Sequence, residues 1–243
     1  MRSLFAFLFC FVFFSAYGQN KDSIQTSVLV IPYMSGMHMS DSDQDISDES
    51  QMDLGEMRSS FRYGLVKALN KKFAEVYDTK VIQTNFVRDE DNDMDNLYHA
   101  LVFEQDTTSP AKDPKKFANK DTSLNYGKVF KKTKPSETYI GIDVRDQKLL
   151  PELSEKYGAN YFIFLNEFDI KTHFEDCINL ALKIYRRDFT VHYTIMDRTG
   201  NIIYGDAVTI HYPSNNNNVH EIIDYNFPKV ADYVLESFER AIK

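Results

Sequence analysis

The sequence has few cysteines and glycines and no tryptophan. Its 243 residues include two cysteines and nine glycines. Two cysteines cannot build the disulfide framework of a small scaffold protein, and no cysteine–histidine pairing typical of thiol catalysis is in view. There is no glycine-rich phosphate loop and no Gly-x-Ser-x-Gly elbow, which argues against nucleotide binding and α/β-hydrolase chemistry. Packing of apolar side chains must therefore stabilise the fold.

The first 18 residues have the pattern of an export signal. Arg2 is their only charge, an apolar run extends over residues 4–14, and small residues stand at Ala16 and Gly18. The run is shorter than the roughly 20 residues that a membrane-spanning helix needs. We therefore expect residues 1–18 to be a cleaved signal peptide, a mature chain that starts at Gln19, and a periplasmic or secreted location.

The two cysteines fit this interpretation. Cys10 lies inside the apolar run rather than at its end, so we do not expect a lipid-modified cysteine. Once the leader is removed, Cys177 is the only cysteine and no intramolecular disulfide can form. It could join two chains, so a homo-oligomer is possible, although a lone cysteine is more often an inert core residue.

Positive charge is also scarce. Lysine and arginine total 28 against 36 acidic residues, which gives a formal net charge of −8. A nucleic-acid-binding protein needs cations to neutralise phosphates, so we expect no nucleic acid partner. The roughly 225 residues after the leader suffice for one large domain with a substantial core.

Hydrophobic patterning predicts the first half of the fold. A continuous apolar run at 28–33 is typical of a strand buried on both faces. Residues 34–51 read as a loop, and a helix follows in which Met57, Phe61, Leu65, Leu69 and Phe73 form one stripe, with Asp53 or Ser50 as its cap. Gly64 in that helix suggests close packing against the sheet. A second short strand is predicted at 79–84, and residues 85–135 read as a polar surface insertion with one short helix near 97–103.

The second half is predicted to end in a long antiparallel meander. Residues 138–142 form a short strand or the start of a helix, and a helix at 149–157 ends at Gly158 in a left-handed cap. Strands follow at 161–171, 178–196 and 202–212, the second with a β-bulge near 185–187 and the last two joined by a turn at 197–201. A helix with a bend at Pro228 ends the chain.

These elements predict a mixed α/β fold. We expect residues 19–243 to form a single domain with one mixed β-sheet of about five strands and helices packed on it. The insertion at about 85–135 would lie on the surface of that domain.

Three stretches carry a resemblance to a known group. Residues 28–33 resemble its first strand with a terminal proline and aromatic, residues 155–163 its Gly-Ala turn before a buried strand, and residues 195–204 its Asp-x-x-Thr-Gly hairpin. The group is the bacterial envelope fold of the TolB amino-terminal domain, CsgG and LpoB. The resemblance implies a non-catalytic domain that binds other envelope proteins. Its lipoprotein members carry an acylated cysteine, which we do not expect here.

Two acidic segments, at 41–53 and 89–95, open like calcium loops. Asp41, Asp43 and Asp45 have the right spacing, but Ile46 replaces the required glycine and Met52 the closing glutamate. Residues 89, 91 and 93 repeat the pattern, again without the glycine and the glutamate. Solvated acidic loops are therefore the favoured interpretation, with a weak calcium module as an alternative.

Other patterns are weaker. His220, Glu221 and Asp224 partly match a zinc-protease motif, and His38 with Met34, Met37 and Met39 could attract copper(I). Glu167 and Asp169 share one strand face, and Asp188, Thr190 and His192 share another; we interpret both as a solvated sheet face.

From these patterns we assign no catalytic, cofactor-binding or metal-binding residue and expect no cofactor. The favoured function is an exported, non-catalytic protein that binds another cell-envelope component, expected to be a protein, by direct contact. The alternative is a hydrolase or metal-dependent enzyme whose site assembles only in the fold; it would need a concave pocket with clustered titratable groups.

Overall fold

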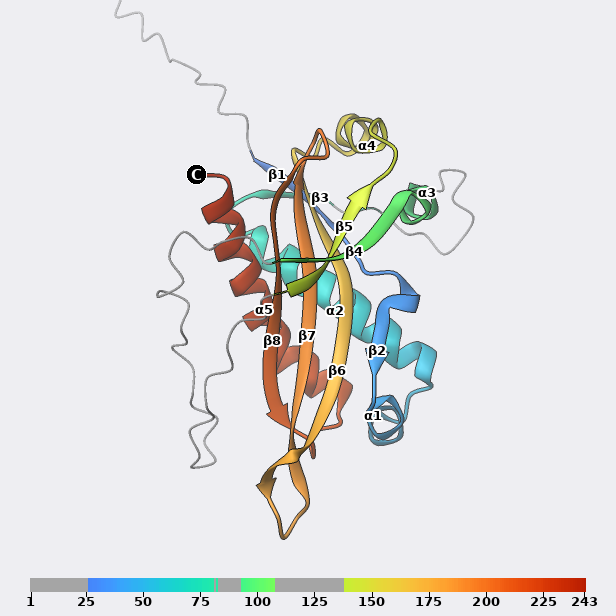
Figure 1. Ribbon diagram of the computed structural model, residues 1–243, viewed down its shortest axis with the longest axis vertical. Helices are drawn as coiled ribbons and strands as arrows, with labels where there is room; N and C mark the ends of the chain where they lie inside the picture. The colour runs from blue at the N-terminus through green and yellow to red at the C-terminus, as the bar shows by residue number, and fades with distance from the viewer. Residues whose placement is uncertain (1–25, 81, 83–92, 108–137) are drawn as a thin grey trace, which may run out of the picture.

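The computed structural model describes residues 26–80, 82, 93–107 and 138–243. The expected signal peptide therefore lies outside the described residues. The chain forms the mixed α/β fold that the patterning predicts, with a six-stranded sheet in the order β3-β1-β6-β7-β8 and β2 pairing with β6 (Figure 1). Its strands are β1 (Ser27–Ile31), β2 (His38–Ser40), β3 (Asp78–Lys80), β6 (Tyr161–Asn179), β7 (Ile184–Asp197) and β8 (Ile202–Pro213).

The long strand β6 is the centre of this sheet. On one edge, β1 pairs with it in parallel from Tyr161 to Phe164, and β2 pairs with it in parallel from Phe168 to Ile170. On the other edge, β7 and then β8 continue as an antiparallel meander. Because Pro32 cannot donate a backbone hydrogen bond, the chain leaves the sheet after β1 and returns to it as β2.

The prediction that residues 34–51 form a loop is wrong. After η1 (Ser35–Met37) and β2, the chain forms α1 (Asp43–Ser50). Ile46 of α1 is fully buried, so tertiary packing stabilises this helix. Serine and aspartate are poor helix formers, which is why the local sequence does not predict it.

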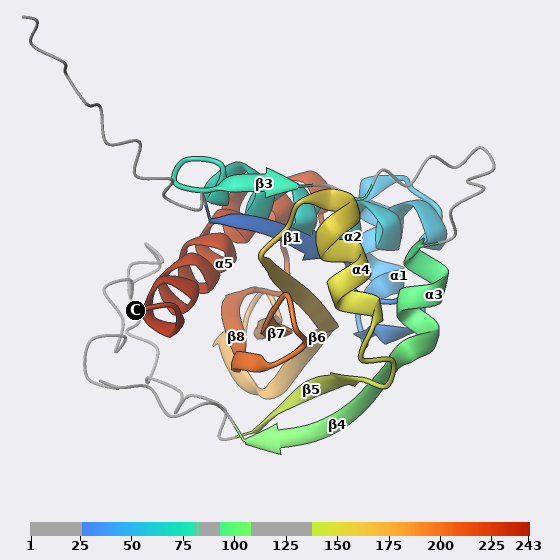
Figure 2. The same ribbon diagram turned by 90° about the horizontal axis from the view of Figure 1, so that it is seen from above.

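Two helices, α2 (Leu54–Phe73) and α5 (Val219–Ala241), cover one face of the sheet (Figure 2). The five residues of the predicted stripe in α2 are all fully buried, and Asp53 with Glu56 forms a capping box at its start. Pro228 lies inside α5. Gly64 faces α5 rather than the sheet, since an added Cβ would stand 3.1 Å from Ile223.

The opposite face is covered near one end of the sheet by smaller elements. These are α3 (Asp93–Ala100), α4 (Leu149–Tyr157) and the two-stranded sheet of β4 (Leu101–Thr107) and β5 (Thr138–Val144). The sheet has a hydrophobic core on each face, and alternate residues of β1 pack into one or the other. Val28 and Val30 belong to the core beneath α2 and α5. Leu29 and Ile31 belong to the second core, together with Leu97. As predicted, α4 ends at a left-handed Gly158 with φ of 68°.

Two local predictions need correction. Within the predicted surface insertion, residues 93–107 form α3 and β4, and Leu97 is fully buried; its other parts, 85–92 and 108–135, lie outside the described residues. The predicted strand at 178–196 is two strands, because β6 ends at Asn179 and β7 begins at Ile184. The change in alternation there is caused by a hairpin turn and not by a bulge near 185–187. The turn at 197–201 is confirmed, with Gly200 at φ of 88°.

The contact between β5 and β8 depends on Gly205. The Tyr139 ring lies over this residue so closely that a Cβ there would overlap the ring.

We predict that Gly205→Ala lowers the free energy of unfolding by about 1–3 kcal/mol, because the buried ring has to move. In a Tyr139→Ala background the same change should cost far less. A double-mutant cycle by urea denaturation measures the coupling; additive effects would contradict this packing.

Candidate functional site

The end of the β6–β7 hairpin projects beyond the rest of the sheet. The last pair between β2 and β6 is Ser40–Ile170, and β8 ends at Pro213 opposite Arg186. Beyond these positions only β6 and β7 continue, and Figure 1 shows their turn at one extreme of the long axis. A two-stranded ribbon is marginally stable in water by itself, so this extension needs support from its side chains.

The projecting part contains an irregular bulge. The pairs His173–Arg186 and Cys177–Tyr185 are neighbours on β7, but residues 174–176 of β6 intervene between them. Such bulges bend a strand and redirect its side chains. The turn itself follows at 180–183, where Lys183 adopts a left-handed φ of 52°.

The end of the hairpin exposes large apolar side chains. We call residues 174–185 the hairpin tip. Within it Phe174 is 68% exposed, Leu180 81% and Leu182 69%. Cys177 is half-buried, and its Sγ lies 3.7 Å from the carbonyl oxygen of Ile184. Concentration of three such side chains on one projection is unusual, because isolated exposed apolar residues are normal but clusters mark contact sites.

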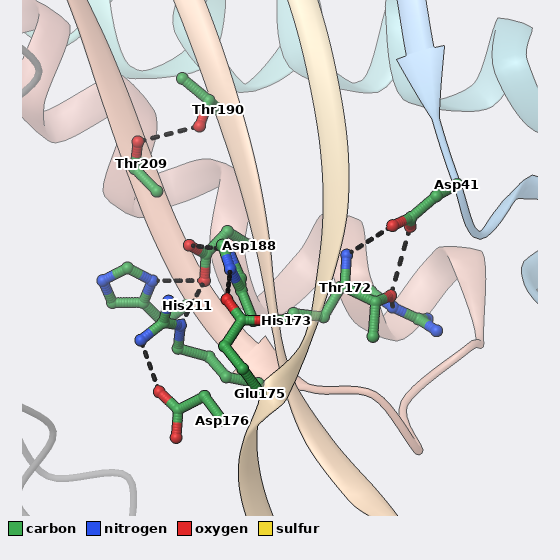
Figure 3. A network of polar contacts seen from close by, with 11 residues as sticks. Asp41, Thr172, His173, Glu175, Asp176, Asp188, Thr190, Thr209 and His211 are labelled. Atoms are coloured by element: carbon green, nitrogen blue, oxygen red, sulfur yellow. Dashed lines mark hydrogen bonds and ion pairs between the residues drawn. The ribbon is translucent and has the colours of Figure 1, made fainter.

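A carboxylate at the root of the tip gathers three basic side chains (Figure 3). Asp188 of β7 accepts from His211 of β8 at 2.6 Å and from His173 of β6 at 2.9 Å, and Arg186 lies 3.2 Å from it. We call these four residues the Asp188 cluster. Charge-assisted bonds of this kind are stronger than neutral ones, and here they join three neighbouring strands where the sheet narrows.

Further contacts connect the Asp188 cluster with the tip. Arg186 donates to Asp176 at 2.6 Å, and His173 lies 3.1 Å from Glu175. The rings of Phe174 and Tyr185 meet edge to face with centroids 5.3 Å apart. The tip is thus held in a defined shape by contacts between its own two strands and by Ser214, which follows β8 and hydrogen-bonds to Tyr185.

On the opposite face of the sheet, a buried guanidinium supports the root of the hairpin. Arg187 donates to Thr172 at 3.0 Å and to Asn217 at 2.5 Å, and it lies 3.5 Å from Asp45 of α1. Asp41 in turn accepts from the Thr172 backbone N–H at 2.8 Å (Figure 3). These contacts fasten β2, α1 and the start of α5 to the root of the hairpin.

The prediction of a solvated acidic loop at 41–53 is wrong in two respects, because residues 43–50 form α1 and Asp43 is buried, whereas Asp41 and Asp45 are exposed as expected. Asp43 is 8% exposed and accepts from His38 at 2.9 Å and from Arg58 at 2.6 Å. Burial raises the pKa of Asp43, but the hydrogen bond and charge of His38, together with further donors, outweigh it and lower the pKa to about 2. Its carboxylate is already used inside the fold.

The second acidic segment is described only from Asp93 onward. This residue lies at the start of α3, where it pairs with Lys156 at 2.7 Å and accepts from Tyr157 at 2.6 Å. Residues 89–92 lie outside the described residues.

The remaining motif residues are not brought together into a site. His220, Glu221 and Asp224 are exposed on α5. His38 is buried with both ring nitrogens near Tyr33 and Asp43, whereas Met39 is 53% exposed and Met37 packs on the core. Among the described residues, no group of three histidine, cysteine or acidic side chains is arranged to hold a metal ion.

The predicted polar sheet face exists but is less solvated than expected. Glu167 lies opposite His192, and Asp169 lies opposite Thr190. Burial and the charge of Asp169 raise the pKa of Glu167, and burial raises the pKa of Asp169. Burial lowers the pKa of His192 to about 4, and its Nδ1 accepts from the Ile140 N–H at 2.9 Å, so β5 shields this end of the face.

A pocket lies elsewhere, between β4, β5 and β8. Its volume is about 320 Å³, and it is lined by Glu104, Asp106, Gly141, Ile142, Asp143 and Ile202. It does not include Glu167, Asp169 or His192, the half-buried titratable groups of the sheet face. This pocket and those shifted groups therefore do not form the joint site that the enzyme alternative needs.

A scan against protein-family models finds no match for this chain, and a search of curated proteins finds none either. The resemblance to the TolB, CsgG and LpoB fold therefore stays a prediction. Within the described part of the chain, no helix is both long and apolar enough to cross a membrane.

The Asp188 cluster supports the hairpin, so its loss should be measurable. We predict that Asp188→Asn lowers the free energy of unfolding at pH 7 by about 2 kcal/mol, because His173 and His211 lose a charged acceptor and Arg186 loses a nearby negative charge. Urea denaturation would measure it, with exposed Asp224→Asn on α5 as the control. A change no larger than that of the control would show that Asp188 is not a support.

The buried Asp43 predicts a pH dependence. Its folded-state pKa, about 2, lies below its ordinary value of 3.8, so the stability it contributes is complete above about pH 4 and disappears as the pH falls to 2. We predict that Asp43→Asn costs about 2 kcal/mol at pH 7 and that the difference from the unmodified protein shrinks between pH 4 and pH 2. Denaturation curves across this range test it; a constant difference would contradict the pairing.

Proposed function

We propose that this is an exported, non-catalytic protein that binds another component of the bacterial cell envelope, and that the hairpin tip is its contact surface. The observation that carries the proposal is the tip itself: Phe174, Leu180 and Leu182 are each more than two-thirds exposed. Exposure of such side chains is unfavourable in water unless another surface covers them.

The construction of the hairpin supports the same proposal. The Asp188 cluster and Arg187 support its root from both sides of the sheet, while Phe174 and Tyr185 stiffen the ribbon. A preorganised projection loses little conformational freedom on binding, so more of its apolar contact contributes to affinity.

The enzyme alternative has less support. The pocket between β4, β5 and β8 is lined by carboxylates and apolar groups, and the half-buried Glu167, Asp169 and His192 lie outside it. General acid–base chemistry requires such groups beside a bound substrate. We therefore favour contact over catalysis.

Site-specific photocrosslinking in the native cell tests the contact surface. We expect a photoreactive side chain at Leu182 to form discrete adducts with envelope material, whether protein or lipid, because the tip is covered there in use. The control position is Ile202, an apolar residue 46% exposed at the start of β8. Equal or absent crosslinking at both positions would argue against the tip as a contact surface, and a cytosolic product that retains Met1 would remove the export proposal.

A further inference from the structure

We infer that the hairpin tip inserts into the lipid interface of a membrane. The inference rests on the proposed contact function and names the material that covers the tip. From the sequence we expect a protein partner, but the shape and chemistry of the tip favour lipid over a protein pocket.

The area of the tip is the first reason. Even a fully buried aromatic side chain contributes only roughly 150–250 Å², so the exposed parts of Phe174, Leu180 and Leu182 together offer no more than about 500 Å². A stable protein–protein interface takes about 800 Å² from each partner. Three apolar side chains are therefore a small protein interface, or a small contact between two copies, but they are sufficient for shallow insertion into a bilayer surface, which has no shape to match.

The order of residue types along the tip is the second reason. The turn at the end carries Leu180, Ala181 and Leu182. Lys183 beside them is exposed, and its long aliphatic chain allows the ammonium group to reach the headgroups. One layer closer to the body, Phe174 and Tyr185 form the aromatic pair. Aromatic rings at the level of the headgroups, with aliphatic side chains beyond them, are typical of membrane-interface contacts.

Charge at the root is the third reason. The two carboxylates within the tip have basic partners at its root, Asp176 with Arg186 and Glu175 with His173. Pairing lowers the cost of bringing these groups close to lipid. The whole chain has a net charge of −8, so attraction to anionic headgroups cannot drive the contact, and the association should depend on apolar burial.

The expected binding is weak and reversible. Three mostly exposed apolar side chains resemble a single acyl anchor, whose membrane association constant is on the order of 10⁴ M⁻¹. Because like charges repel, anionic vesicles should bind the protein no better than neutral ones, and added salt should not release it.

The natural chain lacks tryptophan, which allows a fluorescence test without background. We expect the emission of Leu182→Trp to shift to shorter wavelength when phosphatidylcholine vesicles are added. The matched control, Ile202→Trp, stands at the start of β8 beside the pocket and should not shift. Absence of a shift at Leu182, or an equal shift at both positions, would overturn the lipid inference.

Vesicle sedimentation of the otherwise natural chain provides the second measurement. The double variant Leu180→Ser with Leu182→Ser should bind at least about tenfold more weakly, whereas Ile202→Ser should bind as the natural chain does. All three side chains are exposed in part, so melting temperatures should hardly change and confirm that each variant folds. Equal binding by the double variant would overturn the inference.

The two proposals fail in different ways. If Leu182 crosslinks a discrete protein in cells while no variant responds to vesicles, the tip is a protein-binding element: the lipid inference is wrong and the contact function stands. If neither crosslinks nor vesicle binding are found, both proposals are wrong. Binding that requires anionic vesicles and disappears in salt would show electrostatic adsorption and would also overturn insertion of the tip.

Discussion

Coverage of the strand β6 is the constraint on which the rest of the structure depends. Its apolar residues point to both faces, so Ile163 and Phe168 need α2 and α5, whereas Phe162 and Phe164 need the elements on the opposite face. Its edges need partners as well, because an unpaired strand edge exposes backbone donors and acceptors. On one edge, β1 and β2 pair with successive parts of β6, and on the other edge β7 pairs with it.

This arrangement separates the molecule into a buried half and a polar half. Near the β1 end, both faces of the sheet are covered and the core continues on each side. Toward the hairpin, one face keeps its helices, whereas the other carries Glu167, Asp169, Thr190 and His211 in place of apolar groups. Cross-strand hydrogen bonds and ion pairs take over from apolar packing there, and Arg187 and Asp188 concentrate them just before the sheet narrows to two strands.

The hairpin tip is the place where local rules are broken. Its apolar side chains have no core to enter, its register contains a bulge, and Lys183 occupies a left-handed conformation. Proteins tend to depart from consistent patterning at sites of function, where a contact with another molecule offsets the cost. A stiff root with an apolar end is the physical basis of the proposal that this projection is a contact surface.

The sequence by itself determined the elements whose signals are local. The stripe of Met57 to Phe73, the Asp53 cap, the buried run of β1 and the glycine turns at 158 and 200 depend on residues close together in the chain, and all appear as expected. Only the tertiary structure decided the rest. The helix α1 and the strand β2 depend on contacts with distant parts of the chain: Ile46 is buried in the core, and Thr172 of β6 donates to Asp41. The sequence does not predict the hairpin tip, because residues 179–183 contain no glycine that would indicate a turn. Only the pairing of β6 with β7 places the two leucines of this segment at the end of the molecule.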